Sequence, residues 1–128
     1  MKEELNAVMQ FHKAFKLGVN NNPVANLGEQ KNLLRYKLME EENNEYLAAA
    51  NTGDLVEVAD ALGDMLYILC GTIIEHGLQD KIEAVFKEIQ RSNMSKLNAQ
   101  GNPEYRADGK VLKGANYAPP NLIEILKK

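Results

Sequence analysis

Cysteine, histidine and proline are scarce in this chain, and tryptophan is absent. Its 128 residues include one cysteine, two histidines and four prolines. A single cysteine excludes an internal disulfide, and the apolar neighbours of Cys70 predict a buried thiol in a reducing compartment. With so few histidines and cysteines, we do not expect a zinc site built from nitrogen and sulfur ligands.

Long apolar runs and a broad basic surface are also missing. The longest uncharged apolar run, residues 65–74, is about half of the ~20 residues that a membrane-spanning helix needs. No apolar segment of a signal peptide follows the charged start of the chain. The net charge of -3 is unlike that of a duplex-DNA-binding protein. We therefore expect a cytoplasmic protein that binds neither a membrane nor a nucleic acid polymer.

The length suits a single domain over residues 1–128. Apolar residues at helical spacing predict helices over residues 3–17, 24–51, 55–76 and 82–93. Three glycines and three prolines within residues 97–121 predict an irregular tail over residues 97–128, with one short helical turn at 122–127. No alternating pattern typical of a strand occurs, so the predicted fold class is all-α.

The third predicted helix carries the strongest apolar stripe, and Asp54 is positioned to cap its N-terminus. At about 100° per residue, the acids of this helix lie nearly opposite that stripe. The predicted stripe comprises Leu55, Ala59, Leu62, Leu66 and Ile73, and the acids are Glu57, Asp60 and Asp64.

The second predicted helix places acids where core residues are expected. Glu41 and Glu45 share a face with Leu34 and Leu38, and Glu42 lies at the edge of that face. Residues 40–64 contain eight acids and no Lys or Arg. Repulsion and desolvation would make such a cluster costly, and a bound divalent cation removes that cost. Oxygen ligands favour Mg²⁺ or Mn²⁺. The alternative is a solvated acidic face without a ligand.

Two segments carry a family resemblance. Residues 41–45, Glu-Glu-Asn-Asn-Glu, and residues 53–67, which include Glu57, Asp60 and Asp64, resemble the EExxE and ExxD helices of MazG-type all-α nucleoside triphosphate pyrophosphatases. Residues 91–96 and 108–120 resemble the tail of the phosphoribosyl-ATP pyrophosphohydrolase-like subgroup. The resemblance implies a four-helix bundle completed across a homodimer or homotetramer.

The second motif departs from the family pattern at one position. When it is matched on Asp64, the expected glutamate is Ala61, which cannot bind a metal. Either Asp60, one turn before Asp64, or Glu57 would then supply the missing carboxylate. We therefore expect the metal ligands to be Glu41, Glu42, Glu45, Asp60 and Asp64, with Glu57 as the weaker candidate.

The tail has the opposite charge. Residues 91–113 contain five Lys or Arg and two acids. With the resemblance, we expect Asn93, Lys96, Lys110 and Lys113 to bind the triphosphate. The alternative is that these lysines only keep the tail soluble.

The resemblance implies a nucleotide pyrophosphatase that cleans the nucleotide pool. Such an enzyme hydrolyses a (deoxy)nucleoside triphosphate to the monophosphate and pyrophosphate, with Mg²⁺ as cofactor and Glu41 and Glu42 as catalytic residues. Two alternatives stay open. One is a phosphoribosyl-ATP pyrophosphohydrolase of histidine synthesis, and the other is a helical interaction module without catalytic activity.

Overall fold

The computed structural model describes residues 1–127, which form five helices and no strand. The helices are α1 (Lys2–Ala14), α2 (Glu29–Thr52), α3 (Leu55–Glu75), α4 (Ile82–Met94) and α5 (Ile123–Lys127). A single antiparallel bridge joins Tyr105 and Val111. The fold is therefore all-α, as predicted. None of the described helices is long and apolar enough to cross a membrane.

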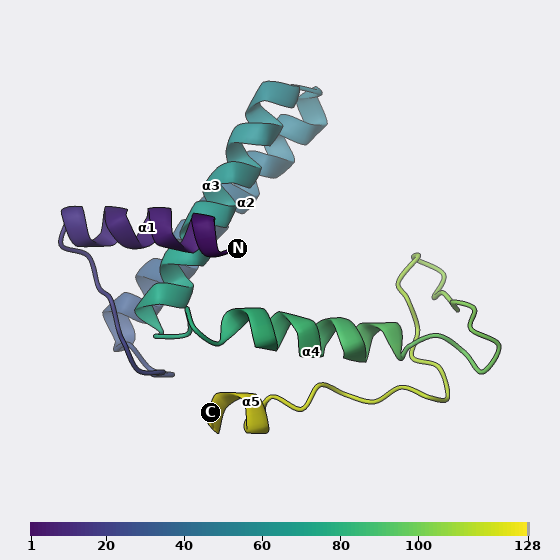
Figure 1. The fold of residues 1–128 in the computed structure, drawn as a ribbon. Helices are drawn as coiled ribbons and strands as arrows, with labels where there is room; N and C mark the ends of the chain where they lie inside the picture. Colours follow the sequence, from purple (N-terminus) through teal and green to yellow (C-terminus); the bar gives the residue numbers. More distant parts are fainter. Residues whose placement is uncertain (128) are drawn as a thin grey trace. The chain divides into compact units, whose positions relative to one another are not determined.

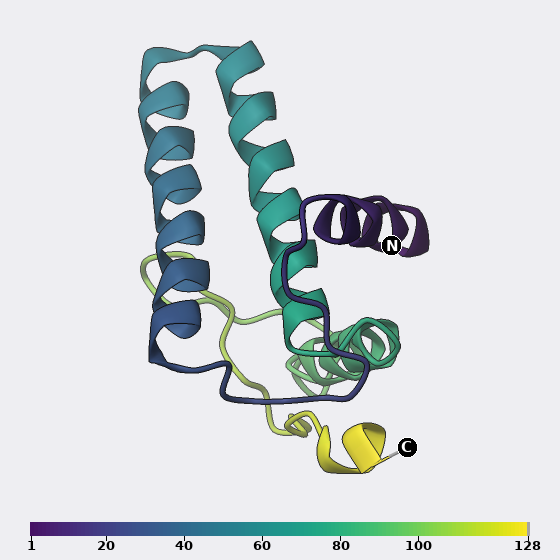
Figure 2. The ribbon, with the colours of Figure 1, turned by 90° about the vertical axis from the view of Figure 1, so that its left-hand side faces the viewer.

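The described residues form two compact units, residues 1–80 and residues 81–127. In the first unit, α2 and α3 run side by side in opposite directions and α1 packs against α3 (Figures 1 and 2). The second unit consists of α4, the irregular tail and α5. The acidic segment lies wholly in the first unit and the basic segment wholly in the second.

The turn between α2 and α3 follows the predicted capping signals. Gly53 ends α2 with a left-handed backbone, at a φ of 72°. Asp54 then caps α3, because its Oδ1 accepts the backbone N–H of Glu57 at 3.1 Å. This short connection makes α2 and α3 antiparallel neighbours.

The start of α2 differs from the prediction, because the helix begins at Glu29 and not at residue 24. Gly28 has a φ of 98°, which breaks the helix there. Val24 is instead held by a backbone bond from its N–H to the carbonyl oxygen of His76, at 2.9 Å. Residues 24–28 are therefore a non-helical connection, tied through Val24 to the end of α3.

Helix α1 ends at Ala14, three residues before its predicted end. Lys16 adopts a left-handed backbone with a φ of 59°, which stops the helix. The side chains of Leu5, Val8 and His12 are buried. His12 donates from Nδ1 to the carbonyl oxygen of Gly18 at 2.8 Å and so ties the helix to the loop that follows.

The apolar stripe predicted for α3 is only partly the core. Ile73 is buried, but the exposed fractions of Leu55, Leu62 and Leu66 are 78%, 49% and 40%. The core side of the helix is instead rich in small residues, since Ala61, Cys70 and Gly71 are all buried. Burial of Cys70 agrees with the prediction.

Candidate active site

Helices α2 and α3 supply six carboxylates to the facing parts of the hairpin. Because the helices are antiparallel, residues late in α2 lie opposite residues early in α3. Glu42 and Glu45 thereby come close to the early acids of α3, and four carboxylates interact electrostatically. These four, Glu42, Glu45, Asp60 and Asp64, are called the carboxylate group below.

Glu42 is the most perturbed member of the carboxylate group. Its pKa is raised to about 7, first by burial and then by a hydrogen bond shared with Glu45 and by the negative charges of Glu45, Asp64 and Asp60. A hydrogen bond between two carboxyl groups requires one of them to carry a proton. Near neutral pH, Glu42 is therefore poised between its protonated and ionised forms.

The surroundings of Glu42 suit a hard cation. Its Oε2 atom is buried and has no hydrogen-bond partner. The acids that act on it, Glu45, Asp60 and Asp64, offer carboxylate oxygens, which are the ligands that Mg²⁺ and Mn²⁺ prefer. As the side chains stand, no three His, Cys, Asp or Glu of residues 1–127 converge on one point as metal ligands. Binding a cation would therefore draw the carboxylates of the two helices closer together.

Three other predicted positions fall around the carboxylate group. Glu41 is exposed and is not among the acids that perturb Glu42. Ala61 is buried, with 2% exposure, on the side of α3 that faces the core. Glu57 and Glu45 both line a surface pocket of about 300 Å³ between the end of α2 and the start of α3. Asp60 acts on Glu42 whereas Glu57 does not, which favours Asp60 as the carboxylate that compensates for Ala61.

A second set of charged residues was not predicted from the sequence. Glu75 is buried and forms ion pairs with Lys31 at 2.8 Å and Arg35 at 3.2 Å. Burial lowers the pKa of the Arg35 guanidinium, and the negative charge of Glu75 raises it. The sequence held one indication of this set, namely that Lys31 and Arg35 lie at helical spacing on the face of α2 that carries Glu42.

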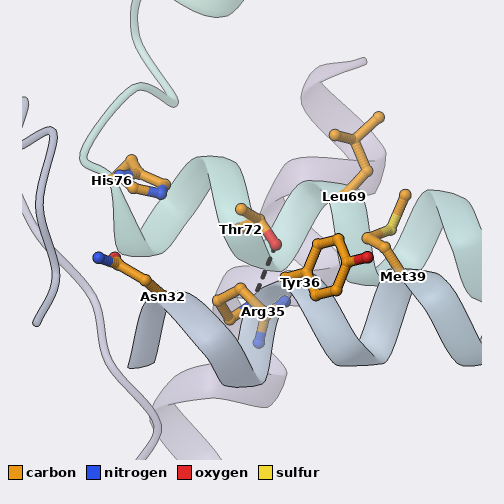
Figure 3. Close-up of a pocket in the computed structure, with 7 residues that line it drawn as sticks. All are labelled: Asn32, Arg35, Tyr36, Met39, Leu69, Thr72 and His76. Carbon is orange, nitrogen blue, oxygen red and sulfur yellow. Dashed lines mark hydrogen bonds between the residues drawn. The ribbon is translucent and has the colours of Figure 1, made fainter. Parts of the chain in front are cut away.

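Arg35 also lines a pocket of about 400 Å³ in the groove between α2 and α3 (Figure 3). Figure 3 shows Tyr36 and Met39 of α2 and Leu69 of α3 around this pocket, with a hydrogen bond between Arg35 and Thr72. The full lining is Asn32, Arg35, Tyr36, Met39, Leu69, Thr72 and His76.

In the second unit, the predicted phosphate-binding residues are held by an ordered tail. The Lys96 carbonyl oxygen accepts the N–H of Gly114 at 2.8 Å, which brings Lys113 beside the end of α4. The Lys113 Nζ lies 4.9 Å from the centre of the Tyr117 ring. Lys110 donates its backbone N–H to Asp108 at 3.1 Å. The side chain of Asn93, at the end of α4, is exposed.

Arg91 fastens the far part of the tail to α4. It donates from Nε to Glu88 at 2.7 Å and from Nη2 to the carbonyl oxygen of Pro119 at 3.1 Å. The pKa of Glu88 is lowered by the hydrogen bond from Arg91 and by a backbone hydrogen bond from Asn121. Arg91 is thus occupied in structure, whereas no ion pair involves Lys96, Lys110 or Lys113 within the described residues.

Comparison with known proteins identifies the family. The family model described as "Phosphoribosyl-ATP pyrophosphohydrolase" matches residues 8–93, more than half of the 128 residues. The match includes both acidic helices and ends just before the basic tail. No curated protein matches the chain. The resemblance seen in the acidic motifs is confirmed, and the chain belongs to the phosphoribosyl-ATP pyrophosphohydrolase family, whose members are MazG-like, all-α pyrophosphohydrolases.

Proposed function

We propose that this protein hydrolyses a (deoxy)nucleoside triphosphate to the monophosphate and pyrophosphate, with Mg²⁺ as cofactor, and so cleans the nucleotide pool. The observation that carries the proposal is the environment of Glu42. Its pKa is raised to about 7 by burial and by three neighbouring acids, and one of its oxygens is buried without a partner. Membership of a pyrophosphohydrolase family supports hydrolysis with release of pyrophosphate as the reaction at this site.

The carboxylate group would hold the metal from both helices, Glu42 and Glu45 from α2 and Asp60 and Asp64 from α3. When bound, Mg²⁺ or Mn²⁺ neutralises phosphate charge and lowers the pKa of a coordinated water. Glu41 is exposed next to the group, which suits a general base that takes the proton of the attacking water. The oxygen of that water forms a bond to phosphorus, and the bond from this phosphorus to the pyrophosphate oxygen breaks.

The second unit supplies positive charge for the triphosphate. Lys96, Lys110 and Lys113 would offset the charge that builds up on the pyrophosphate leaving group. The amide of Asn93 would donate hydrogen bonds to phosphate oxygens. The bond between Lys96 and Gly114 supports this role, because it holds two of these lysines in one part of the tail.

We further propose that the protein is a homodimer or a dimer of dimers. Leu55, Leu62 and Leu66 of α3 are all at least 40% exposed in the single chain. Covering such a stripe with a second copy would remove apolar surface from water at about 25 cal/mol per Å². Size-exclusion chromatography with light scattering measures the mass directly, and a monomer of 14.3 kDa would contradict this part of the proposal.

Pyrophosphate release from a panel of substrates tests the proposed activity. The panel contains the common ribo- and deoxyribonucleoside triphosphates, dUTP and phosphoribosyl-ATP, each with and without Mg²⁺. We expect Mg²⁺-dependent release from at least one triphosphate, and a loss of at least about 100-fold in Glu45→Gln. Glu40→Gln, which changes a solvated acid of the same helix, is the matched control.

Hydrolysis of phosphoribosyl-ATP is the second candidate, since the matching family model bears that name. The family model ends at residue 93, so Lys96, Lys110 and Lys113 lie outside the matched part. The length of the tail and the segment from Asn93 to Lys96 fit nucleotide house-cleaning enzymes of this family better, which is why we favour a nucleoside triphosphate. Turnover of phosphoribosyl-ATP alone would reverse this choice. No turnover and no effect of Mg²⁺ on the melting temperature would favour an interaction module.

A further inference from the structure

A buried set of hydrogen bonds and ion pairs joins α2 to α3 beside the carboxylate group. Arg35 donates from Nε to the Thr72 hydroxyl at 3.0 Å and from Nη2 to the Ile68 carbonyl oxygen at 2.8 Å. Its Nη1 lies 3.2 Å from Glu75, and the side chain is 11% exposed. One guanidinium of α2 therefore contacts three residues spaced four and three positions apart along α3.

The contacts of Arg35 leave little freedom for another arrangement. The Thr72 hydroxyl also donates to the Ile68 carbonyl oxygen, at 2.9 Å. Gly71 makes room for the guanidinium, because a Cβ there would lie 2.8 Å from Nη2 of Arg35 and 2.7 Å from Nε2 of His12. Lys31, one turn before Arg35, pairs with Glu75 at 2.8 Å. The bonds that Arg35 and Lys31 make to α3 all break if α3 slides along α2, whereas the bond between Thr72 and Ile68 lies within α3.

Helix geometry connects these contacts to the carboxylate group. Glu42 lies seven residues after Arg35 on α2, and Asp64 lies eight residues before Thr72 on α3. At a rise of about 1.5 Å per residue, both distances are roughly 10–12 Å along antiparallel helices. When Arg35 is bonded to Thr72, Glu42 is therefore level with Asp64. A shift of one turn, about 5.4 Å, would separate them.

We propose that Arg35 is a positioning residue, which sets the register of α2 against α3 through Thr72, Ile68 and Glu75 and thereby aligns Glu42 with Asp64. In this role Arg35 acts through its bonds to α3 and not through contact with the substrate or the cation. The inference rests on the proposed function, because only a metal-dependent hydrolase needs the carboxylate group to bind a cation. Residues that orient metal ligands typically change metal affinity by about 10- to 100-fold when they are replaced.

The test compares Mn²⁺ binding by four variants of the full chain, read from the electron paramagnetic resonance signal of free Mn²⁺. Arg35→Lys keeps a charge beside Glu75 but cannot donate to three acceptors in the same geometry. Thr72→Val removes one acceptor at nearly constant volume, and Thr72→Ser keeps it. Val8→Ala lowers stability through the contact of α1 with α3, away from Arg35, because Val8 is 2% exposed.

We expect Arg35→Lys to bind Mn²⁺ at least about tenfold more weakly than the wild type, and Thr72→Val to be weakened to a smaller extent. Thr72→Ser and Val8→Ala should keep the wild-type affinity, although Val8→Ala melts at a lower temperature. The Mg²⁺ concentration for half-maximal pyrophosphate release should rise in Arg35→Lys and Thr72→Val. If Arg35→Lys does not fold, the comparison of Thr72→Val with Thr72→Ser decides.

Wild-type affinity in both Arg35→Lys and Thr72→Val would overturn the inference. So would an equal loss of affinity in Val8→Ala, because the effect would then follow stability alone. Failure of the proposed function looks different: the wild-type protein itself would neither bind Mn²⁺ nor release pyrophosphate.

Discussion

Lys31 and Glu75 form an ion pair of 2.8 Å between the start of α2 and the end of α3. The Glu75 side chain is 4% exposed, and its second oxygen lies 3.2 Å from Arg35. A buried carboxylate is tolerated when cations and hydrogen bonds compensate its lost hydration. Here both cations come from one helix and the acid from another, so the pairing ties the open ends of the α2–α3 hairpin together.

Glu75→Gln should lower the free energy of unfolding by about 3 kcal/mol, because it leaves two cations facing a neutral amide. Urea unfolding followed by circular dichroism measures the change. Glu3→Gln, in the exposed first turn of α1, is the matched control and should stay within about 0.5 kcal/mol of the wild type. Equal stabilities of the two variants would show that the ion pairs contribute nothing.

The stability of the metal-free protein should fall as pH rises from about 4.5 to about 7. The pKa of Glu42 is about 7 in the folded chain against 4.5 for an unperturbed glutamate, so the folded state binds more protons in this window. The stabilisation is fully present below pH 4.5 and is lost by the time pH passes 7. Melting temperatures in EDTA, measured at several pH values, report it.

Glu42→Gln is the informative variant for this pH dependence. A neutral amide at position 42 removes the titration, so its melting temperature should change less over the same window than that of the wild type. Glu40→Gln, which replaces a solvated acid outside the carboxylate group, should follow the wild-type curve. Parallel curves for the wild type and Glu42→Gln would mean that Glu42 does not titrate in this range.

Ser95→Ala should loosen the tail without unfolding α4. The Ser95 hydroxyl accepts the N–H of Ala118 at 2.9 Å and donates to the Ser92 carbonyl oxygen at 2.6 Å. Loss of roughly one net hydrogen bond should speed amide exchange near residue 118 by about tenfold. Hydrogen-exchange mass spectrometry measures this. Ser95→Thr retains the hydroxyl and should keep the wild-type exchange rate. An unchanged rate in Ser95→Ala would show that the Ser95 hydroxyl does not hold the tail at Ala118.

Local signals in the sequence predicted most of the helices. The cap at Asp54 depends on neighbouring residues and lies where expected, and α3 ends at Glu75, one residue before its predicted end. The predicted start of α2 was wrong, because the hydrogen bond from Val24 to His76 joins positions that are far apart in the chain. Such long-range bonds leave no periodic pattern in the sequence.

The carboxylate group was predictable because charge and helical spacing coincide in it. In the structure, Glu42 interacts with three of the other predicted acids, Glu45, Asp60 and Asp64. The predicted face was wrong for Glu41, which is exposed, whereas Glu42, predicted at the edge of that face, has a buried carboxylate oxygen. The Arg35–Glu75 pair was not predictable in this way. Glu75 follows an apolar run as a single acid, and only the antiparallel pairing of α2 with α3 shows which cations it meets.

Product analysis of a single reaction tests the central claim most directly. The wild-type protein is incubated with a nucleoside triphosphate and Mg²⁺, and nucleotides and phosphates are separated by anion exchange. The account predicts monophosphate and pyrophosphate in equal amounts, with both products absent when EDTA is added or when Glu42 is replaced in Glu42→Gln. Release of orthophosphate with a diphosphate, or turnover that is indifferent to Mg²⁺ and to Glu42, would contradict it.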